Sequence, residues 1–193
     1  MSTVLKQNRL SHADYFALEQ ADEQRYEYYA GEVFAMAGGS ETHALISMNI
    51  GAALVNALRN KPCRVYGADM KLHVRDHDKF CYPDVQVLCE QGTRHGQYVE
   101  NPVLIVEVLS DSTESYDRGR KFEHYRSIDA LQYYLLVDQN RQHVDLYVRQ
   151  SDNQWLLSSP IDHISFPLLD ISLQLDEIYR QVEFAESAPD ENP

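Results

Sequence analysis

Glu107 is the residue of this sequence that most directly points to chemistry, because it lies inside the most apolar stretch of the chain. Residues 103–109 read VLIVEVL, and a short run this rich in β-branched side chains is typical of a strand buried on both faces. An unpaired carboxylate in such a strand costs roughly several kcal/mol, so it is normally protonated, ion-paired or bound to a metal ion. Glu107 therefore predicts a metal site, with a structural ion pair to a nearby arginine as the alternative.

A second carboxylate, Asp84, precedes Glu107 by 23 residues and follows Pro83 at the expected start of a strand. That separation lets the chain turn through a loop and return beside the first strand, at a spacing of about 4.8 Å. Two carboxylates so placed can share one divalent cation, and oxygen ligands suit Mg²⁺ or Mn²⁺. We predict that Asp84 and Glu107 bind this cation, with the carbonyl of Val108 as a further ligand. The alternative for Asp84 is a Pro-Asp turn.

Lys121 belongs to the expected helix after the Glu107 strand and shares one helical face with Asp117 and Tyr125, at steps of four residues. A helix packed back on the sheet can aim this face at the strand ends. There, Lys121 would stabilise negative charge that develops on a phosphorane, or orient the attacking water. We expect Tyr125 to support the site. The alternative for Lys121 is an intrahelical pair with Asp117, worth about 0.3–0.5 kcal/mol.

Hydrophobic periodicity and turn signals predict the elements that must position these residues. For the first half of the chain we expect a helix at 11–18 that Ser11 caps, a hairpin of strands 25–29 and 32–36, a helix at 43–58 that Ser40 or Thr42 caps, one strand at 64–74 and a turn at 76–79. His43, at the start of the long helix, either reaches the site or caps and packs the helix. Asp69 is a candidate neighbour of Asp84.

The second half of the chain completes the expected sheet. We predict strands at 82–89, 103–109, 132–137, 143–148 and 155–157, a polar loop at 90–101, and helices at 111–127 and 173–184. This order favours an α/β fold with a mixed central sheet flanked by helices, formed by one domain over residues 1–185. The acidic tail at 186–193 is expected to be disordered.

The composition limits the class of protein. Apolar residues make up 44% of the chain, no apolar run approaches the roughly 20 residues that cross a bilayer, and the N-terminus has no cleavable signal pattern. We therefore expect a cytoplasmic protein that does not associate with membranes. The three cysteines, Cys63, Cys81 and Cys89, are odd in number and form no CxxC pair, which favours reduced thiols over a disulfide framework or a zinc–thiolate site.

The net charge of −13 argues against nucleic-acid binding by bulk electrostatics. Basic residues nevertheless gather in two segments, at 59–79 and 118–126. They form either a basic rim beside the acidic site or solvated faces that bind no ligand. The Gly38–Gly39 pair lacks the P-loop pattern, and the sequence contains no zinc finger or basic helix.

Four segments carry a resemblance to a known family: YPDV at 82–85, VEVLS at 106–110, YDRGRK at 116–121 and YYLLVD at 133–138. They resemble the Uma2 family of restriction-endonuclease-like proteins, which belongs to the PD-(D/E)xK nuclease superfamily. The resemblance extends over about residues 10–180, and it includes the dipeptides at 26–27 and 31–32 and His43.

This resemblance implies a restriction-endonuclease-like core that hydrolyses DNA phosphodiesters with Mg²⁺ held by Asp84 and Glu107. In the superfamily motif, a lysine follows the second acidic residue after one spacer, on the same strand. Leu109 occupies that position here, and the resemblance implies that Lys121 is the migrated replacement. Such cores usually have a further acidic residue near their start, for which Glu32 is the first candidate and Glu27 the second.

Three functions are compatible with these residues. The first is a metal-dependent endonuclease with DNA as its substrate, for which a homodimer would bring two sites to two strands. The second is a catalytically silent binding or regulatory module with the nuclease fold, which the acidic chain and Leu109 favour. The third is a metal-dependent hydrolase of a smaller phosphoester. Binding of Mn²⁺ at Asp84 and Glu107 distinguishes a nuclease from the silent module.

Overall fold

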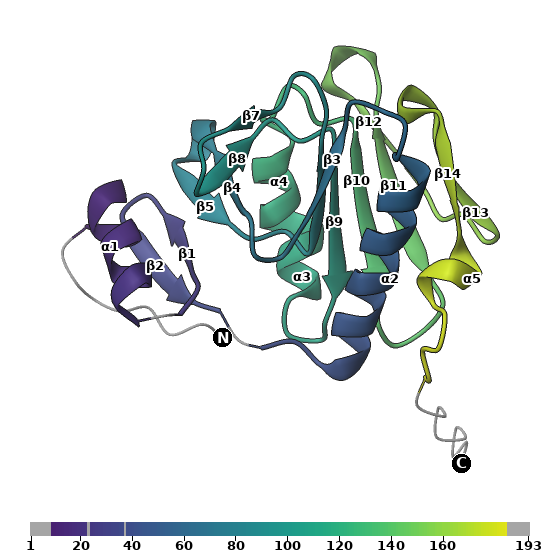
Figure 1. Cartoon of the computed structure of the whole chain (residues 1–193), viewed down its shortest axis with the longest axis horizontal. Helices are drawn as coiled ribbons and strands as arrows, with labels where there is room; N and C mark the ends of the chain where they lie inside the picture. The colour runs from purple at the N-terminus through teal and green to yellow at the C-terminus, as the bar shows by residue number, and fades with distance from the viewer. Residues whose placement is uncertain (1–8, 23, 37, 185–193) are drawn as a thin grey trace.

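The computed structural model describes residues 9–22, 24–36 and 38–184 and confirms the predicted α/β class (Figure 1). Its main sheet is mixed and has the strand order β12 (Trp155–Ser158), β11 (Val144–Arg149), β10 (Tyr133–Asp138), β9 (Leu104–Leu109), β6 (Val85–Leu88) and β3 (Arg64–Gly67). Strands β9 and β10 are parallel, and the other neighbours are antiparallel. All six residues of β9 are buried, which explains its nearly continuous apolar sequence.

Helices cover both faces of the main sheet (Figure 1). One face carries α2 (Glu41–Ala57), the hairpin of β13 (His163–Phe166) and β14 (Ile171–Gln174), and α5 (Leu175–Ile178). The other carries α3 (Glu114–Tyr116), the π-helical turn η2 (Asp117–Lys121) and α4 (Phe122–Tyr125). Because side chains alternate along a strand, Leu104 and Val106 pack in the α2 core, whereas Ile105 and Leu109 pack in the α4 core. Glu107 therefore points to the α4 side.

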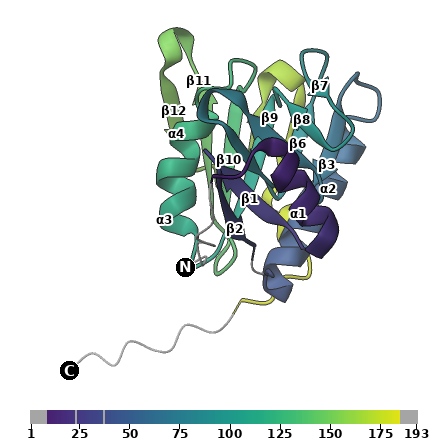
Figure 2. The ribbon, with the colours of Figure 1, turned by 90° about the vertical axis from the view of Figure 1, so that its left-hand side faces the viewer.

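A second sheet lies beside the main one and has the order β2 (Glu32–Ala35), β1 (Tyr26–Tyr29), β5 (Lys79–Cys81), β4 (Lys71–Val74), β8 (Tyr98–Glu100) and β7 (Thr93–Arg94). Helix α1 (His12–Asp22) packs against the β1–β2 hairpin (Figure 2). The core between them is largely aromatic and includes Tyr15, Tyr26, Tyr28 and Phe80. Short 3₁₀ turns occur at η1 (Arg75–His77), η3 (Ser151–Asn153) and η4 (Pro167–Leu169).

The predicted serine caps of both N-terminal helices are confirmed, and the second helix begins at Glu41, two residues before the predicted start. Ser11 and Asp14 form reciprocal hydrogen bonds, since the Asp14 N–H donates to Ser11 Oγ at 3.3 Å and the Ser11 N–H donates to Asp14 Oδ2 at 3.0 Å. At α2, the His43 N–H donates to Ser40 Oγ at 3.1 Å. The hairpin turn at Ala30 and Gly31 has positive φ at both residues, as a tight two-residue hairpin turn requires.

Replacing Ser40 by alanine is expected to lower the free energy of unfolding by about 1 kcal/mol, because the His43 N–H at the start of α2 loses its acceptor. Ser40 Oγ also donates to Gln139 Oε1 at 2.7 Å, and this bond is lost as well. Urea unfolding of the wild type, Ser40→Ala and Ser40→Thr measures the effect. Ser40→Thr should retain most of the stability, and an alanine variant as stable as the wild type would contradict the capping role.

Several segments differ from the prediction. The helix expected at 111–127 consists of α3, the π-helical turn η2 and α4, which together span residues 114–125. Residues 64–74 form two strands in different sheets, β3 and β4, because the chain turns between them with the Met70 N–H bonded to the Gly67 carbonyl at 3.1 Å. The loop at 90–101 contains the β7–β8 hairpin. The segment 173–184 is not a long helix: its start pairs with β13, which buries Leu173 in the core, and only Leu175–Ile178 is helical.

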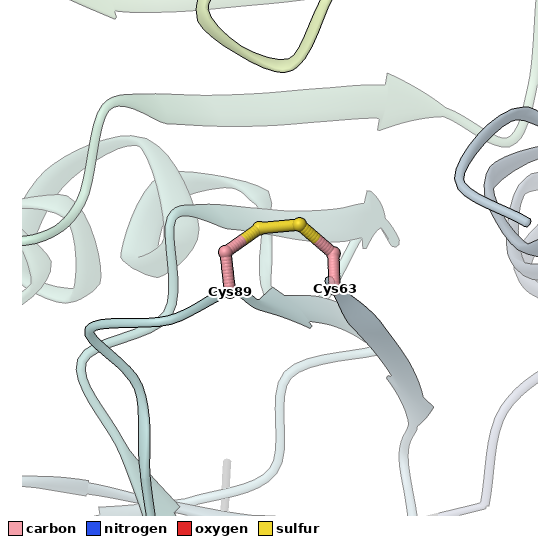
Figure 3. The surroundings of a disulfide bond; sticks show 2 residues. All are labelled: Cys63 and Cys89. Atoms are coloured by element: carbon pink, nitrogen blue, oxygen red, sulfur yellow. A yellow bond between two sulfur atoms is a disulfide. The ribbon is translucent and has the colours of Figure 1, made fainter. Parts of the chain in front are cut away.

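Cys63 and Cys89 form a disulfide, which corrects the prediction of reduced thiols (Figure 3). The register of β3 against β6 pairs Arg64 with Leu88, so the two cysteines just outside that pair face each other, with their Cα atoms 4.1 Å apart. Counting cysteines ignores strand pairing and therefore misses this bond. Cys81 is a free, buried thiol.

In the part of the chain that the structure describes, no helix is long and apolar enough to cross a membrane. The acidic segment predicted to be a disordered tail, residues 186–193, lies outside the described residues.

Candidate active site

Asp84 lies directly before β6, and the register of β6 against β9 brings it level with Glu107 on the neighbouring strand. Strands β6 and β9 pair antiparallel with Val85 opposite Val106, and one further step in this register reaches Asp84 and Glu107. Directly opposed residues have Cβ atoms about 4.5–5.5 Å apart, a spacing at which two carboxylates can bind one cation. The Val108 N–H donates to Asp84 Oδ2 at 2.7 Å, which fixes this carboxylate at the end of β6. The carbonyl of Val108 as a metal ligand stays a prediction.

Glu107 is only 3% exposed, and it has two direct partners in η2 and α4, which cover this face of the main sheet. Lys121 Nζ lies 2.8 Å from its Oε1, and the Tyr125 hydroxyl donates to the same oxygen at 2.8 Å. Burial raises the pKa of Glu107 to about 8, and the nearby carboxylates of Asp84 and Asp117 add to this, although Lys121 opposes it. A divalent cation would favour the charged form of this carboxylate and so fits its surroundings.

Lys121 is buried in the π-helical turn η2, a type of turn that is frequent at functional sites. Its Nζ contacts Glu107 and also lies 3.2 Å from Asp117 Oδ1, so the predicted site contact and the alternative intrahelical pair are both present. Burial acts to lower the pKa of Lys121, but Glu107 and Asp117 outweigh burial and hold the pKa well above its usual value. Lys121 is therefore a permanent cation beside the two opposed carboxylates.

His43 reaches the same site from the first turn of α2. Its Nε2 lies 3.2 Å from Asp84 Oδ2, and the hydrogen bond to Asp84 raises the pKa of His43. Both alternatives for this residue hold, since its backbone N–H completes the helix cap while its side chain contacts a predicted metal ligand.

The structure favours Glu27 over Glu32 as the additional acidic residue. Glu32 lies on the outer strand β2, is exposed and, among the described residues, forms no hydrogen bond or ion pair with the site. Glu27 lies one strand further in, on β1, with its Oε2 3.6 Å from Lys79 Nζ, and it helps to raise the pKa of Lys121. The expectation for Glu32 is corrected because the edge position of β2 keeps it one strand farther from the lysines.

Lys79 is a candidate site residue that the sequence interpretation missed. Its side chain is 1% exposed, and its Nζ donates to the Tyr116 hydroxyl at 2.7 Å. Burial opposes the charge on Lys79, but Glu27 and other neighbours keep its pKa above the usual value. The available signal was a lysine directly before the apolar residues that lead into Pro83 and Asp84.

Two other sequence candidates do not join the site. Asp69 is exposed in the turn after β3 and forms an ion pair with Arg25 at 3.0 Å. Much of the expected basic rim is already neutralised, through the pairs Lys61–Asp170, Lys71–Glu19, Arg75–Glu100 and Arg118–Asp145. Because these cations are paired, the structure favours solvated faces that bind no ligand over a basic rim beside the acidic site.

The donor atoms fit a hard divalent cation. Asp84, directly before β6, and Glu107 on β9 offer carboxylate oxygens, the ligand type that Mg²⁺ and Mn²⁺ prefer. Among the described residues, Asp117 Oδ1 is a buried oxygen without a hydrogen-bond partner, even though Lys121 Nζ is within ion-pair distance. An acidic site with a buried, incompletely satisfied oxygen has unused capacity to bind positive charge.

A model of the family described as "Uma2: Putative restriction endonuclease" matches residues 12–176. The chain belongs to the Uma2 family. This Uma2 chain is also similar to two uncharacterized proteins of Synechocystis sp. (strain ATCC 27184 / PCC 6803 / Kazusa), each 35% identical. The protein slr1290 aligns over 91% of this chain and 94% of its own length, and sll1609 aligns over 82% and 91%.

The Uma2 chain also resembles a crystal structure from Anabaena variabilis ATCC 29413, described as "a putative nuclease belonging to DUF820". The TM-score is 0.65 with 17% sequence identity, and the match covers 81% of this chain and 90% of the other. At this identity the likeness concerns the fold, and it confirms the predicted nuclease fold class.

The raised pKa of Glu107 predicts that the contribution of this residue to the stability of the metal-free protein falls as the pH rises. The folded protein retains the Glu107 proton up to a pH of about 8, whereas the ordinary value is 4.5, so the folded state binds more protons between these values. The contribution of Glu107 to the free energy of unfolding is complete below the ordinary pKa. It is lost at about 1 kcal/mol per pH unit as the pH rises toward the pKa of the folded state.

Urea unfolding in EDTA, from about pH 5 to about pH 9, measures this slope. Glu107→Gln is the matched control, because a glutamine has the same shape and does not titrate. The difference between the two stability curves should fall across this window, and parallel curves would show that Glu107 titrates normally.

Proposed function

We propose that this Uma2 protein is an endonuclease that hydrolyses DNA phosphodiester bonds with Mg²⁺ or Mn²⁺. One observation carries the proposal: the opposed carboxylates Asp84 and Glu107 share a buried site with Lys121, whose Nζ is 2.8 Å from Glu107. Membership of the Uma2 family and the nuclease fold support this class of reaction.

Asp84 and Glu107 would hold the cation, and the Val108 N–H keeps the Asp84 carboxylate in place. The bound ion would activate water and polarise the scissile phosphate as a Lewis acid. The Tyr125 hydroxyl anchors one oxygen of Glu107 and leaves the other oxygen available to the cation. His43 holds a proton at Nε2 beside Asp84 and adds positive charge there when it is protonated.

Lys121 would stabilise the negative charge that builds up on the phosphoryl oxygens. Asp117 lies 3.2 Å from Lys121 Nζ, so its carboxylate helps to fix the ammonium group before the substrate arrives. A charge that is fixed in advance in a buried site stabilises a transition state more than the same charge in water. Lys79, which Glu27 and Tyr116 hold at the neighbouring sheet, would add a second buried positive charge near Lys121.

A catalytically silent module is the second candidate, and a specific observation favours it. Lys121 and Tyr125 already contact Glu107, and burial keeps this group protonated up to a pH of about 8, so it does not require a metal ion in order to be tolerated. The net charge of −13 and the pairing of Lys61, Lys71, Arg75 and Arg118 with acidic residues also weaken attraction to DNA.

Cleavage of supercoiled plasmid tests the proposal. The wild-type protein should convert the plasmid to nicked or linear DNA with Mg²⁺ or Mn²⁺, and EDTA should stop the reaction. The activity must elute with the 22.3 kDa chain or its oligomer on a sizing column, which excludes a co-purifying nuclease.

Calorimetry with Mn²⁺ decides the meaning of a negative result. Binding without cleavage of any DNA form would direct the assignment to a smaller phosphoester. Neither cleavage nor binding would overturn the proposal and favour the silent module.

A further inference from the structure

A second group of potential metal ligands lies outside the candidate active site, where α1 meets the second sheet. It consists of His12 on α1, His73 on β4 and Asp78 directly before β5. One potential ligand atom from each of these residues lies within 4.8 Å of the other two. The sequence interpretation assigned no role to any of the three.

Two imidazole nitrogens and one carboxylate oxygen are a donor set that suits Zn²⁺ better than Mg²⁺. Zinc binds such atoms at about 2.0–2.2 Å, so the ligand atoms around a tetrahedral ion lie roughly 3.3 Å apart. His12 Nε2 and Asp78 Oδ1 are 2.6 Å apart, and both side chains are nearly half exposed. A small rotation of these side chains therefore opens the space for an ion, and the exposure gives it a path from solvent.

The surrounding residues orient the donors as in metal sites. His73 Nδ1 lies 2.8 Å from Glu100 Oε1, so a proton on Nδ1 bonds to this carboxylate and the lone pair of Nε2 is left for a metal ion. Arg75 holds the other oxygen of Glu100 at 2.6 Å. The Tyr28 hydroxyl lies 3.3 Å from Asp78 Oδ2 and 3.2 Å from the Leu10 carbonyl oxygen, and it can donate to either, which leaves Asp78 Oδ1 for the cluster.

The three ligands stand on rigid supports. The ring of His73 stacks on Phe80 with the centroids 4.3 Å apart, and the ring of His12 makes edge contacts with Tyr28 and Phe80 at 5.2 and 5.0 Å. Asp78 has a left-handed backbone, with φ of 46°, and its carbonyl accepts the Ala30 N–H at 3.0 Å. Ligands fixed in this way lose little conformational entropy when an ion binds.

We propose that His12, His73 and Asp78 bind one Zn²⁺ ion, with water as the fourth ligand. The ion fastens helix α1 to the turn before β5 and so joins two segments more than 60 residues apart in the sequence. The site is independent of the proposed nuclease reaction, because none of its ligands contacts Asp84, Glu107 or Lys121 in the described part of the chain.

Titration of EDTA-treated full-length protein with Zn²⁺ tests the site, in a Glu107→Gln background that weakens metal binding at the active site. Calorimetry should give one bound Zn²⁺ per chain, and Co²⁺ in its place should give a visible absorption spectrum from nitrogen and oxygen ligands. Saturating Zn²⁺ should also raise the thermal midpoint of unfolding.

Substitutions assign the ligands. His12→Ala should weaken Zn²⁺ binding by at least about 100-fold. Glu100→Gln, which changes the residue that orients His73 and also pairs with Arg75 and His95, should weaken it by about 10–100-fold. Asp78→Asn keeps a residue type that tolerates the left-handed backbone, and it covers the case in which His12→Ala does not fold. His163→Ala, at an exposed histidine on β13, is the matched control and should bind as the parent does.

Loss of binding in Asp78→Asn or His12→Ala, but not in His163→Ala, supports the proposal. The absence of Zn²⁺ binding in the parent, or equal affinity in the parent and in Asp78→Asn and His12→Ala, overturns it. Plasmid cleavage is not a readout in either case, so failure of the zinc site and failure of the nuclease assignment are distinguishable.

Discussion

Glu107→Gln is expected to lower metal-dependent plasmid cleavage by at least about a thousandfold and to leave the protein folded. Glutamine fills the same space in β9 but lacks the negative charge that holds a cation opposite Asp84. The fold should persist because Lys121 keeps Asp117 as an ion-pair partner at 3.2 Å. Initial rates of nicking at saturating Mn²⁺, with circular dichroism on the same samples, measure both parts of the prediction.

Glu32→Gln is the matched control for this experiment. It makes the same chemical change at the acidic residue that lies exposed on the edge strand β2, and it should keep cleavage within about twofold of the wild type. If Glu107→Gln cleaves as fast as the wild type, the reaction does not use this site. If instead Glu32→Gln loses activity, the preference for Glu27 is wrong.

Lys121→Met is expected to reduce the cleavage rate by about 100–1,000-fold while Mn²⁺ binding is retained. Methionine replaces the apolar stem of the lysine as far as Cε but removes the cation that faces Glu107 at 2.8 Å. Without this cation, developing charge on the phosphate loses its buried counter-charge, whereas the two carboxylates opposed across β6 and β9 stay in place. Single-turnover cleavage at saturating Mn²⁺ separates this chemical effect from metal affinity.

Two further methionine variants show whether the effect is specific to Lys121. Arg120→Met changes an exposed cation in the same helical turn and should have little effect. Lys79→Met tests the lysine on β5 and should have a smaller effect than Lys121→Met. Full activity of Lys121→Met beside an inactive Glu107→Gln would refute the migrated lysine, and an inactive Lys79→Met would transfer the role to the neighbouring sheet.

The sequence predicted the part of the site that depends on local periodicity. Glu107 stands out because the surrounding run is apolar, and Lys121 and Tyr125 share one face because helical spacing places them there. The proximity of Asp84 and Glu107 followed from their separation of 23 residues, which lets the chain leave one strand and return beside it. Each of these arguments needs only residues that are near one another in the sequence.

The residues that depend on the second sheet were not predictable in this way. The order β2-β1-β5-β4-β8-β7 brings Glu27 beside Lys79, two residues 52 positions apart, and nothing in either local sequence encodes that pairing. Both Glu27 and Glu32 sit in strand-like segments, and only the edge position of β2 separates them. The choice between Glu27 and Glu32 therefore depends on the order of strands in the sheet, which cannot be predicted from sequence periodicity.

The mistaken elements share a related cause. The stretch 64–74 has enough alternation for one strand, but the turn at Gly67 divides it between two sheets. The segment 173–184 has a spacing of apolar residues that suits a helix, yet its first residues form a strand because they pair with β13. In both cases tertiary contacts outweigh a weak local preference.

The Cys63–Cys89 bond has a consequence for the position of Asp84. Strand β6 has only four residues, and it separates the half-cystine at one end from Asp84 at the other. A slip of one residue along its neighbour would turn Asp84 to the opposite face of the sheet. Because the bond fastens β6 to β3, neither strand can slip alone. Oxidation of Cys63 and Cys89 thus helps to keep the Asp84 carboxylate on the correct face of the sheet, although neither cysteine forms a hydrogen bond with it.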